Sequence, residues 1–311
     1  MTQYFPIIVV SPEAREDARV EPMGTKRKFW YRTPDGGRWL FKFNRPAHGE
    51  DWAEKIACEI AELLGLPHAV ADLASCENQS GVAVRDFVPE GFRLVHGNEL
   101  LVELVDPAYP RDQNFKVRQH NLPNVFHVLQ TASVALPSAI HLPAGVNSAA
   151  GLLAGYLLLD ALISNTDRHH ENWAILERRA AKDQPRVAEL APTFDHASSL
   201  GRNEPDEKRQ LRLDGRDTQY TVSTYLAKAP SRIYASDADE RPLSPLDAFA
   251  GASRVVPAAA RAWLAALDYC STDSVREIVA RVPDERMSAV ARRFVLRMVE
   301  LSRQELLRLC P

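Results

Sequence analysis

Cysteine is scarce in this sequence, and its spacing excludes the common cysteine-based sites. The 311-residue chain has four cysteines, and no two of them form a C-x-x-C pair. That spacing argues against a zinc knuckle or a thioredoxin-type redox motif, and wide scatter is typical of reduced thiols in a cytosolic protein. We therefore expect a cytoplasmic protein. The cysteines are Cys58, Cys76, Cys270 and Cys310.

Long apolar segments and an excess of one charge are also missing. The longest apolar stretch, Ala149–Ile163, is shorter than the roughly 18 residues that indicate a membrane span, and it suits a buried helix. The first residues hold a short apolar run without a basic leader, which indicates a strand rather than a signal peptide. A formal net charge of −3 gives no general attraction to nucleic acid or to an anionic membrane. We expect neither as a direct partner.

What the chain does have is an ordinary globular composition and a strand-rich first part. It is 45% hydrophobic and 25% charged, and its length suits one large two-lobed unit or two domains. The turn Thr33–Gly37 predicts a hairpin of Lys28–Arg32 with Arg38–Phe43. Asp51 is the predicted N-cap of a helix that ends at Gly65. We expect residues 1–90 to form a small antiparallel sheet covered by one helix. The further strands expected there are Tyr4–Val10, Val70–Leu73 and Gly81–Val88.

Residues 91–311 are predicted to form a larger, mainly helical part. Leu104–Asn124 contains Asp-Pro and Tyr-Pro pairs and is interpreted as an irregular connector. Gly201–Thr224 is polar and charged, and is expected to be a flexible surface loop. Two apolar segments, Trp173–Leu176 and Val187–Leu190, are expected to be strands. The predicted helices are Val125–Ala135, Ser148–Ser164, Ala258–Leu267, Thr272–Val282 and Met287–Leu309.

Three polar residues in the second part have the order and spacing that phosphoryl transfer from ATP requires. Asp167 follows an apolar helix, Asn172 comes five residues later, and Asp195 follows the next two strands. In such a loop the first aspartate accepts the proton of the acceptor hydroxyl, and the asparagine and second aspartate bind Mg²⁺. A lone D-x-x-x-x-N is common, because Asp and Asn are ordinary loop residues. The apolar helix, the apolar strand and the later aspartate together favour a catalytic loop.

The first part should then supply a phosphate lid and a lysine. Gly24, Thr25, Lys26 and Lys28 lie between expected strands, where glycine allows close approach and amides and lysines can bind phosphate. With a single glycine, a solvated basic turn is an equal alternative for this segment. Lys42 alternates with large apolar residues, and a lysine at such a position either points to solvent or reaches into a cleft. The mixed character of its own strand face favours the cleft.

A glutamate on the predicted 51–65 helix is expected to pair with that lysine. Helical spacing places Glu59 closest to the apolar stripe and Glu54 farther round. The two candidates therefore stay open on periodicity alone.

These residues resemble the HipA-like bacterial serine/threonine kinases over residues 20–200. The resemblance lies in Gly24–Lys28, Lys42, Glu54 with Leu64-Gly65-Leu66-Pro67, the loop from Asp167 to Asn172, and Asp195. It implies an α+β, two-lobed protein-kinase-like fold, with residues 1–90 as the N-lobe and 91–311 as the C-lobe.

The resemblance also assigns roles to these positions. It implies Asp167 as catalytic base, Asn172 and Asp195 as Mg²⁺ ligands, and Lys42 on the α- and β-phosphates of ATP, with Glu54 as its partner. His169 joins the expected nucleotide site and is expected to hold the catalytic loop by hydrogen bonds. The backbone of Arg85, Phe87 and Val88 would form the hinge that holds adenine.

Such kinases act on serine or threonine in proteins, including translation components, and many are toxins paired with a small helix-turn-helix antitoxin. Two features depart from the family. The additional N-terminal subdomain of its full-length members is expected to be missing. Glu21 stands where some members carry a regulatory lid serine, which puts autophosphorylation there in doubt.

Three other interpretations fit parts of the pattern. A small-molecule kinase of the aminoglycoside or choline type, or a lipid kinase, uses the same three residues, although its loop usually reads His-x-Asp, whereas Ser164-Asn165-Thr166 precedes Asp167 here. A non-catalytic nucleotide-binding partner protein would not need all these positions intact. A metal hydrolase could use His169, His170, Asp195 and His196, but two adjacent histidines cannot face one ion from a helix.

Overall fold

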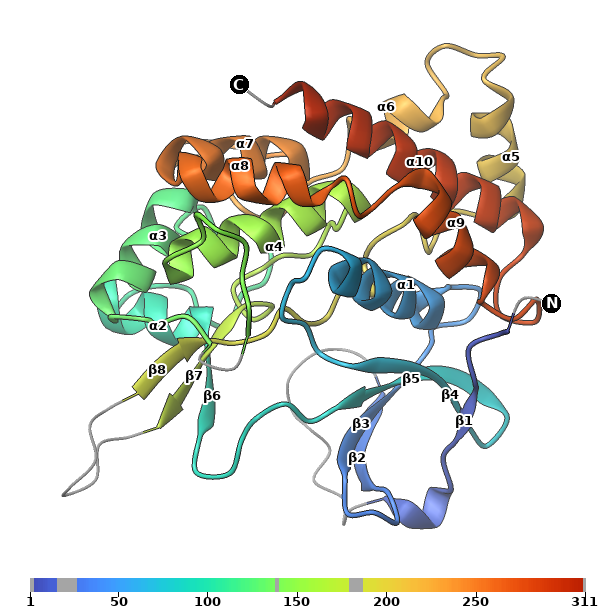
Figure 1. Cartoon of the computed structure of the whole chain (residues 1–311), viewed down its shortest axis with the longest axis horizontal. Coiled ribbons are helices and arrows are strands. Elements are labelled where there is room, and N and C mark those ends of the chain that lie inside the picture. The colour runs from blue at the N-terminus through green and yellow to red at the C-terminus, as the bar shows by residue number, and fades with distance from the viewer. Residues whose placement is uncertain (1–2, 16–26, 138–139, 179–186, 310–311) are drawn as a thin grey trace.

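A five-stranded sheet and a larger helical body make up the molecule, with helix α1 (Glu50–Leu63) between them (Figure 1). This computed structural model describes residues 3–15, 27–137, 140–178 and 187–309. The arrangement confirms the predicted α+β fold with a small N-terminal sheet and a mainly helical C-terminal part. Gly24, Thr25 and Lys26 of the expected lid, together with Glu21, lie outside the described residues.

The N-terminal sheet has the strand order β1-β4-β5-β3-β2. The predicted hairpin is confirmed, because β2 and β3 pair antiparallel from Lys28–Lys42 to Arg32–Arg38. The expected strand Tyr4–Val10 is shorter than predicted, and the observed strand Ile8–Val9 pairs parallel with β4. The strand is shorter because Pro6 has no backbone N–H to donate to a neighbouring strand. The strands are β1 (Ile8–Val9), β2 (Lys28–Arg32), β3 (Arg38–Phe43), β4 (Ala71–Cys76) and β5 (Gln79–Arg85).

Helix α1 lies against β4 and β5 on one side and against the helical body on the other. Its N-cap position is Gly49, two residues before the predicted cap, so Asp51 lies inside the first turn and is not the cap. The Asp51 carboxylate is buried and instead accepts from the Arg286 guanidinium at 2.9 Å. This ion pair ties the first turn of α1 to the C-terminal part of the chain.

A second, three-stranded sheet lies beneath the helical body, in the order β6-β7-β8 (Figure 1). Its last two strands confirm the strands predicted around residues 173–176 and 187–190. The segment between α4 and β7 is the expected catalytic loop, so a buried helix and the central strand of this sheet hold its two ends. The strands are β6 (Arg93–His96), β7 (Ala174–Arg178) and β8 (Val187–Leu190).

The helical body is built around α4, every residue of which is buried. Helices α7 and α8 pack along it, and α10 crosses it. The five predicted helices are present with shifted ends, and the connector before α3 is irregular as expected. Helices α2 and α7 were not predicted. The helices are α2 (Gly97–Leu104), α3 (Leu122–Thr131), α4 (Ala149–Ile163), α7 (Pro245–Val255), α8 (Pro257–Ala266), α9 (Thr272–Ala280) and α10 (Ala289–Arg308).

The prediction of a loop over Gly201–Thr224 was wrong, because this segment contains helices α5 (Asp206–Asp214) and α6 (Val222–Leu226). Helix α5 is strongly polar, so it has little apolar periodicity to reveal it. Its Arg209 is buried and donates to the Gly201 carbonyl oxygen at 3.0 Å, and the helix lies against α10. Tertiary contacts therefore order a segment that reads as a surface loop.

The largest apolar cluster contains residues from both sides of position 90. Trp52 and Ile56 of α1 belong to it together with Leu158 of α4 and Trp263 of α8. The division into lobes at residue 90 therefore stays a prediction. Within the described residues, no helix has both the length and the apolar character that crossing a membrane requires.

Candidate active site

The loop that joins α4 to β7 is held by its own hydrogen bonds. Ser164 ends α4 in the left-handed conformation, at φ 52°, and turns the chain out of the helix. Asn165 Oδ1 accepts from the Asp167 amide at 3.1 Å. Asn172 Nδ2 donates to the Asp167 carbonyl oxygen at 2.7 Å, which fixes the orientation of the Asn172 amide. The amide oxygen of Asn172 is thereby left as the atom that can bind a cation.

A buried ion pair anchors this loop to α4. Arg168 donates through Nε and Nη2 to the two carboxylate oxygens of Asp160, at 2.7 and 2.8 Å, and both side chains are 1% exposed. The same guanidinium donates to the Asn172 carbonyl oxygen, and at 3.0 Å to Thr193 Oγ1. Burial lowers the pKa of Arg168, but Asp160 outweighs that effect and holds the pKa above its usual value. Arg168 therefore links α4, the loop and the segment before Asp195.

The two adjacent histidines of the loop have different partners. His170 is buried and lies 2.6 Å from the Tyr109 hydroxyl and 2.9 Å from Asn114 Oδ1, and burial lowers its pKa to about 4. His169 Nδ1 accepts from the Glu171 amide at 3.2 Å. His169 thus makes a hydrogen bond within the loop. Among the described residues, neither His169 nor His170 belongs to a group of side chains that could hold a metal ion, so the metal-hydrolase interpretation gains no support from them.

Lys42 and Asp195 lie together. The Lys42 ammonium is 3.2 Å from Asp195 Oδ1 and its side chain is only 12% exposed, so it points into the molecule rather than to solvent. Asp195 has a left-handed backbone, at φ 58°, which is uncommon for a residue with a side chain. Gly81 of β5 allows the close approach of the strands, because a Cβ there would lie 2.3 Å from the Lys42 carbonyl oxygen.

Asp167 of the catalytic loop lies near Lys42 and Asp195. Burial lowers the pKa of His169, and the carboxylates of Asp167 and Asp195 oppose that shift. Burial also lowers the pKa of Arg202, which the same two aspartates oppose after Glu50. The His169 imidazole and the Arg202 guanidinium thus both interact electrostatically with the two carboxylates. Ser198, three residues after Asp195, donates to Asp167 Oδ2 at 3.3 Å and accepts from Arg202 at 3.0 Å, which supports the same placement of Asp167 near Asp195.

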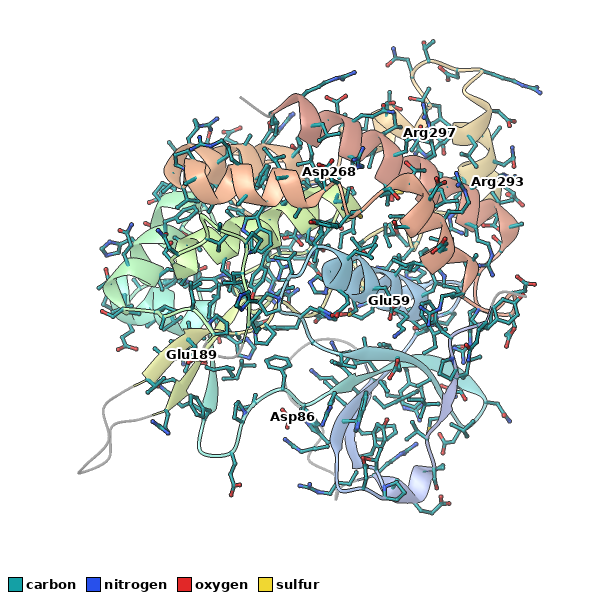
Figure 2. The ribbon with its side chains drawn as sticks, viewed as in Figure 1. Glu59, Asp86, Glu189, Asp268, Arg293 and Arg297 are labelled. Carbon is teal, nitrogen blue, oxygen red and sulfur yellow. The ribbon has the colours of Figure 1, made fainter. Side chains whose placement is uncertain are left out.

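Glu54, not Glu59, is the glutamate of α1 that faces this region. Glu59 pairs with Lys55 at 2.8 Å and with Arg281 at 3.4 Å, on the side of α1 near α9 (Figure 2). Glu54 is fully buried. Burial raises the pKa of Glu54, but His196 and then Lys42 outweigh it and hold the pKa below the usual value. Helical spacing pointed to Glu59 because it does not show that α1 is covered on two sides.

His196 was considered only as a metal ligand from sequence, and the structure gives it another setting. Its Nδ1 lies 3.5 Å from Glu54 Oε1, and its Nε2 lies 2.8 Å from Thr193 Oγ1. Thr193 already accepts from Arg168, so its own proton is available to His196 Nε2. That assignment directs the His196 Nδ1 proton toward Glu54. A chain of polar contacts therefore runs from the catalytic loop to α1.

The same two residues belong to a cluster of metal-ligating types. Glu54, Cys58 and His196 offer ligand atoms within 4.8 Å of one another, and all three are buried. The Cys58 thiol donates to the Ala69 carbonyl oxygen at 3.2 Å. Cys58 and His196 thus both have protein partners.

The expected adenine hinge begins at the last residue of β5, Arg85, and its other residues, Phe87 and Val88, lie beyond the strand. Asp86 lies in the connection between the two sheets (Figure 2) and accepts from Arg38 at 3.0 Å. Phe87 packs against Phe194, with ring centroids 5.5 Å apart, next to Asp195. The Val88 amide donates to Asp86 Oδ1 at 3.0 Å, so this amide has a partner within the chain.

Of the expected lid, Lys28 is described. Lys28 of β2 lies opposite Lys42 of β3 in the strand register, so the two lysine side chains lie on one face of the sheet. Lys28 therefore lies next to the lysine that contacts Asp195.

Three comparisons with known proteins show which family and fold this chain is similar to. The family model described as the HipA-like C-terminal domain matches residues 20–263. The serine/threonine-protein kinase CtkA of Helicobacter pylori is 24% identical over 190 residues, which are 61% of this chain and 52% of that protein. The chain thus matches about half the length of this curated relative.

Two solved structures share the fold. The crystal structure of the Helicobacter pylori proinflammatory kinase CtkA matches with a TM-score of 0.74 and 19% identity, over 98% of this chain and 97% of that one. HipA from the toxin–antitoxin complex of Shewanella oneidensis with HipB and operator DNA matches with a TM-score of 0.55 and 13% identity, over 95% and 65%. The family match covers most of the chain and includes every residue of the site described above, so this protein belongs to the HipA-like C-terminal domain family.

Proposed function

We propose that this protein is an ATP-dependent serine/threonine protein kinase. The observation that carries the proposal is the meeting of Lys42 with Asp195, beside a loop that presents Asp167 and Asn172. Carboxylate and amide oxygens are the ligands that Mg²⁺ prefers, and a lysine suits phosphate. The donor set therefore fits a magnesium-bound triphosphate.

In this proposal each residue has one task. Asn172 Oδ1 and the Asp195 carboxylate would hold Mg²⁺, which when bound neutralises charge on the phosphates. Lys42 would bind the α- and β-phosphates, with Glu54 keeping its ammonium in place. Asp167 would accept the proton of the acceptor hydroxyl. Ser198 Oγ donates to Asp167 Oδ2 at 3.3 Å, which supports the orientation of that carboxylate.

The remaining nucleotide contacts of the proposal lie on the N-terminal side. Lys28, beside Lys42, and the lid residues Gly24, Thr25 and Lys26 would bind phosphate oxygens. The connection that holds Arg85, Phe87 and Val88 would receive adenine, with the Phe87 ring beside Asp195 supporting its apolar face. His169 would close the site from the catalytic loop.

The proposed acceptor is a serine or threonine of a protein, and the family resemblance implies components of the translation apparatus as the first candidates. The proposed partner is a small helix-turn-helix antitoxin. The Shewanella relative, whose complex contains HipB and operator DNA, supports an antitoxin partner of that kind. Growth arrest on expression that disappears with Asp167→Asn tests the toxin part of the proposal. Normal growth with the active protein contradicts it.

The kinase proposal is tested by phosphate transfer. Purified protein is incubated with γ-labelled ATP, Mg²⁺ and a cell lysate, and labelled protein bands are expected. Asp167→Asn and Asp195→Asn should each lower the transfer by at least about a hundredfold, because each removes a charge that the reaction requires. The matched control is Asp268→Asn, since Asp268 is 82% exposed on the outer face of the helical body (Figure 2).

The control should retain the wild-type rate. Label that enters only small molecules identifies a small-molecule kinase instead. Equal transfer by wild type and Asp195→Asn contradicts the proposed site.

A further inference from the structure

Arg232, between α6 and α7, has an unfavourable backbone conformation. Its φ is +73°, in the left-handed region that favours glycine. An arginine gains nothing locally from this conformation, unlike asparagine or aspartate. Such residues persist only where the surrounding structure holds them, and they cluster at functional sites.

Hydrogen bonds to the catalytic region hold this backbone. His120 Nδ1 lies 3.0 Å from the Arg232 carbonyl oxygen, and His120 Nε2 accepts from the Trp173 indole N–H at 3.1 Å. Because Nε2 is an acceptor, the proton of the imidazole lies on Nδ1 and is donated to Arg232. Trp173 directly follows Asn172. Two residues beyond, the Tyr234 amide donates to the His120 carbonyl oxygen at 3.0 Å.

The side chain points at the proposed catalytic base. Arg232 Nε lies 3.6 Å from Asp167 Oδ1. Among the residues that the structure describes, this buried Nε has no hydrogen-bond acceptor. The guanidinium carbon lies 3.7 Å from the centroid of the Phe115 ring, which is 64% exposed. The cation is thus supported from one side by an aromatic ring and directed toward Asp167.

An open pocket adjoins the guanidinium. Arg232, Phe115, Lys116 and His169 all line a pocket of about 260 Å³ beside the catalytic loop. Asp167 does not line this pocket, but His169, two residues after it, does, so a ligand in the pocket would lie beside both the guanidinium and the catalytic loop. Arg232 therefore lies between this pocket and the Asp167 carboxylate, which is 3.6 Å from its Nε.

A purely structural role does not explain this arrangement. The contact with Asp167 is longer than a hydrogen bond, and both side chains keep some exposure, at 23% and 36%. Partly exposed pairs of this kind contribute little to stability. Ser198 already orients the other oxygen of Asp167. The ion pair alone therefore does not offset the free-energy cost of the strained backbone.

We propose that Arg232 is a further catalytic residue, whose guanidinium binds the phosphoryl group during its transfer; this inference rests on the proposed kinase function. In that step the acceptor oxygen forms a bond to the γ-phosphorus, and the bond from this phosphorus to the bridging oxygen breaks. The bridging oxygen keeps the electron pair and leaves with ADP, and the hydroxyl proton passes to Asp167. The planar fork of an arginine suits the oxygens of the transferred group.

The decisive variant is Arg232→Gly, because glycine adopts the positive φ without strain and the fold should therefore survive. Its melting temperature should equal or exceed that of the wild type. A fluorescent ATP analogue should bind within twofold of the wild-type affinity. Transfer of labelled γ-phosphate, to lysate proteins and to water, should fall about a thousandfold, the effect typical of a transition-state arginine.

Two further variants sharpen the comparison. Arg232→Lys keeps the charge without the fork and should lose less activity than Arg232→Gly. Arg297→Ala, on the exposed face of α10 (Figure 2), is the matched control and should stay within twofold of the wild type.

Three outcomes overturn the inference. Wild-type transfer by Arg232→Gly shows that the guanidinium takes no part. A lower melting temperature together with weaker nucleotide binding shows that Arg232 is structural. Absence of transfer by the wild-type protein overturns the kinase proposal and this inference with it, whereas an active wild type with an active Arg232→Gly overturns this inference alone.

Discussion

The substitution Asp160→Asn tests whether the buried pair with Arg168 holds the catalytic loop. Asp160 accepts three hydrogen bonds in the structure, two from Arg168 and one from Asn165 Nδ2 at 2.8 Å. Asparagine has nearly the same shape, so the packing around α4 is kept. It places an NH₂ group against a guanidinium donor and leaves the Arg168 charge without a carboxylate.

The magnitude follows from burial. Both side chains are 1% exposed, and removal of one partner from such a pair costs about 3–5 kcal/mol, because an uncompensated charge stays in the interior. For a chain of this size that corresponds to a melting temperature roughly 10 °C lower. The exposed pair of Asp268 with Arg303 is separated by 3.7 Å, and Asp268→Asn should cost less than about 1 kcal/mol.

Urea denaturation followed by circular dichroism measures both costs. The double variant Asp160→Asn/Arg168→Met removes both charges, so it should be more stable than the sum of the single changes predicts, by about 1–3 kcal/mol. Phosphate transfer should fall in Asp160→Asn even where the protein is folded, because Arg168 also binds Asn172 and Thr193. A cost under 1 kcal/mol for Asp160→Asn, or strict additivity in the double variant, would refute this reasoning.

Two further predictions concern histidines. Burial lowers the pKa of His120 to about 3 and that of His170 to about 4, so the unfolded chain, with histidine pKa values near 6.5, binds more protons below pH 6.5. The free energy of unfolding should therefore fall as the pH drops from 6.5 toward 4, by up to about 1.4 kcal/mol per pH unit for each histidine. His170→Gln should reduce this dependence on pH in thermal melts. An unchanged dependence contradicts the assignment. His196→Leu removes the donor toward Glu54, the proposed partner of Lys42, and should weaken binding of a fluorescent ATP analogue roughly tenfold. His196→Asn keeps a donor and should restore the binding. Equal affinity of the wild type and both variants excludes this positioning role.

Local pattern and spacing predicted much of the fold and of the candidate site. The hairpin of β2 and β3 follows from a five-residue turn between apolar strands, and α4 follows from an unbroken apolar run. The order of Asp167, Asn172 and Asp195 along the chain reflects a loop and a hairpin that are continuous in sequence. Such features depend on neighbours within a few turns or strands, so a single sequence displays them.

Other features cannot be predicted from the sequence alone, because contacts between distant segments create them. Helix α5 is polar, and it is ordered by its contact with α10. Arg168 binds Asp160 eight residues earlier and Thr193 far along the chain, which no motif spells out. Arg232 carries no sequence signal at all, because its strained backbone and its place beside Asp167 arise from a segment 65 residues away.

The sequence by itself determined the hairpin, helix α4 and the other strongly patterned elements, and it placed Asp167, Asn172 and Asp195 in the order of the proposed site. Hydrophobic periodicity and turn chemistry are local, and the catalytic loop brings its own residues. Only the tertiary structure decided that Lys42 meets Asp195, that Glu54 lies buried beside His196, and that Glu59 pairs with Lys55 instead. Those choices depend on which faces of α1 are covered and by what, and that is set by packing between segments far apart in the chain.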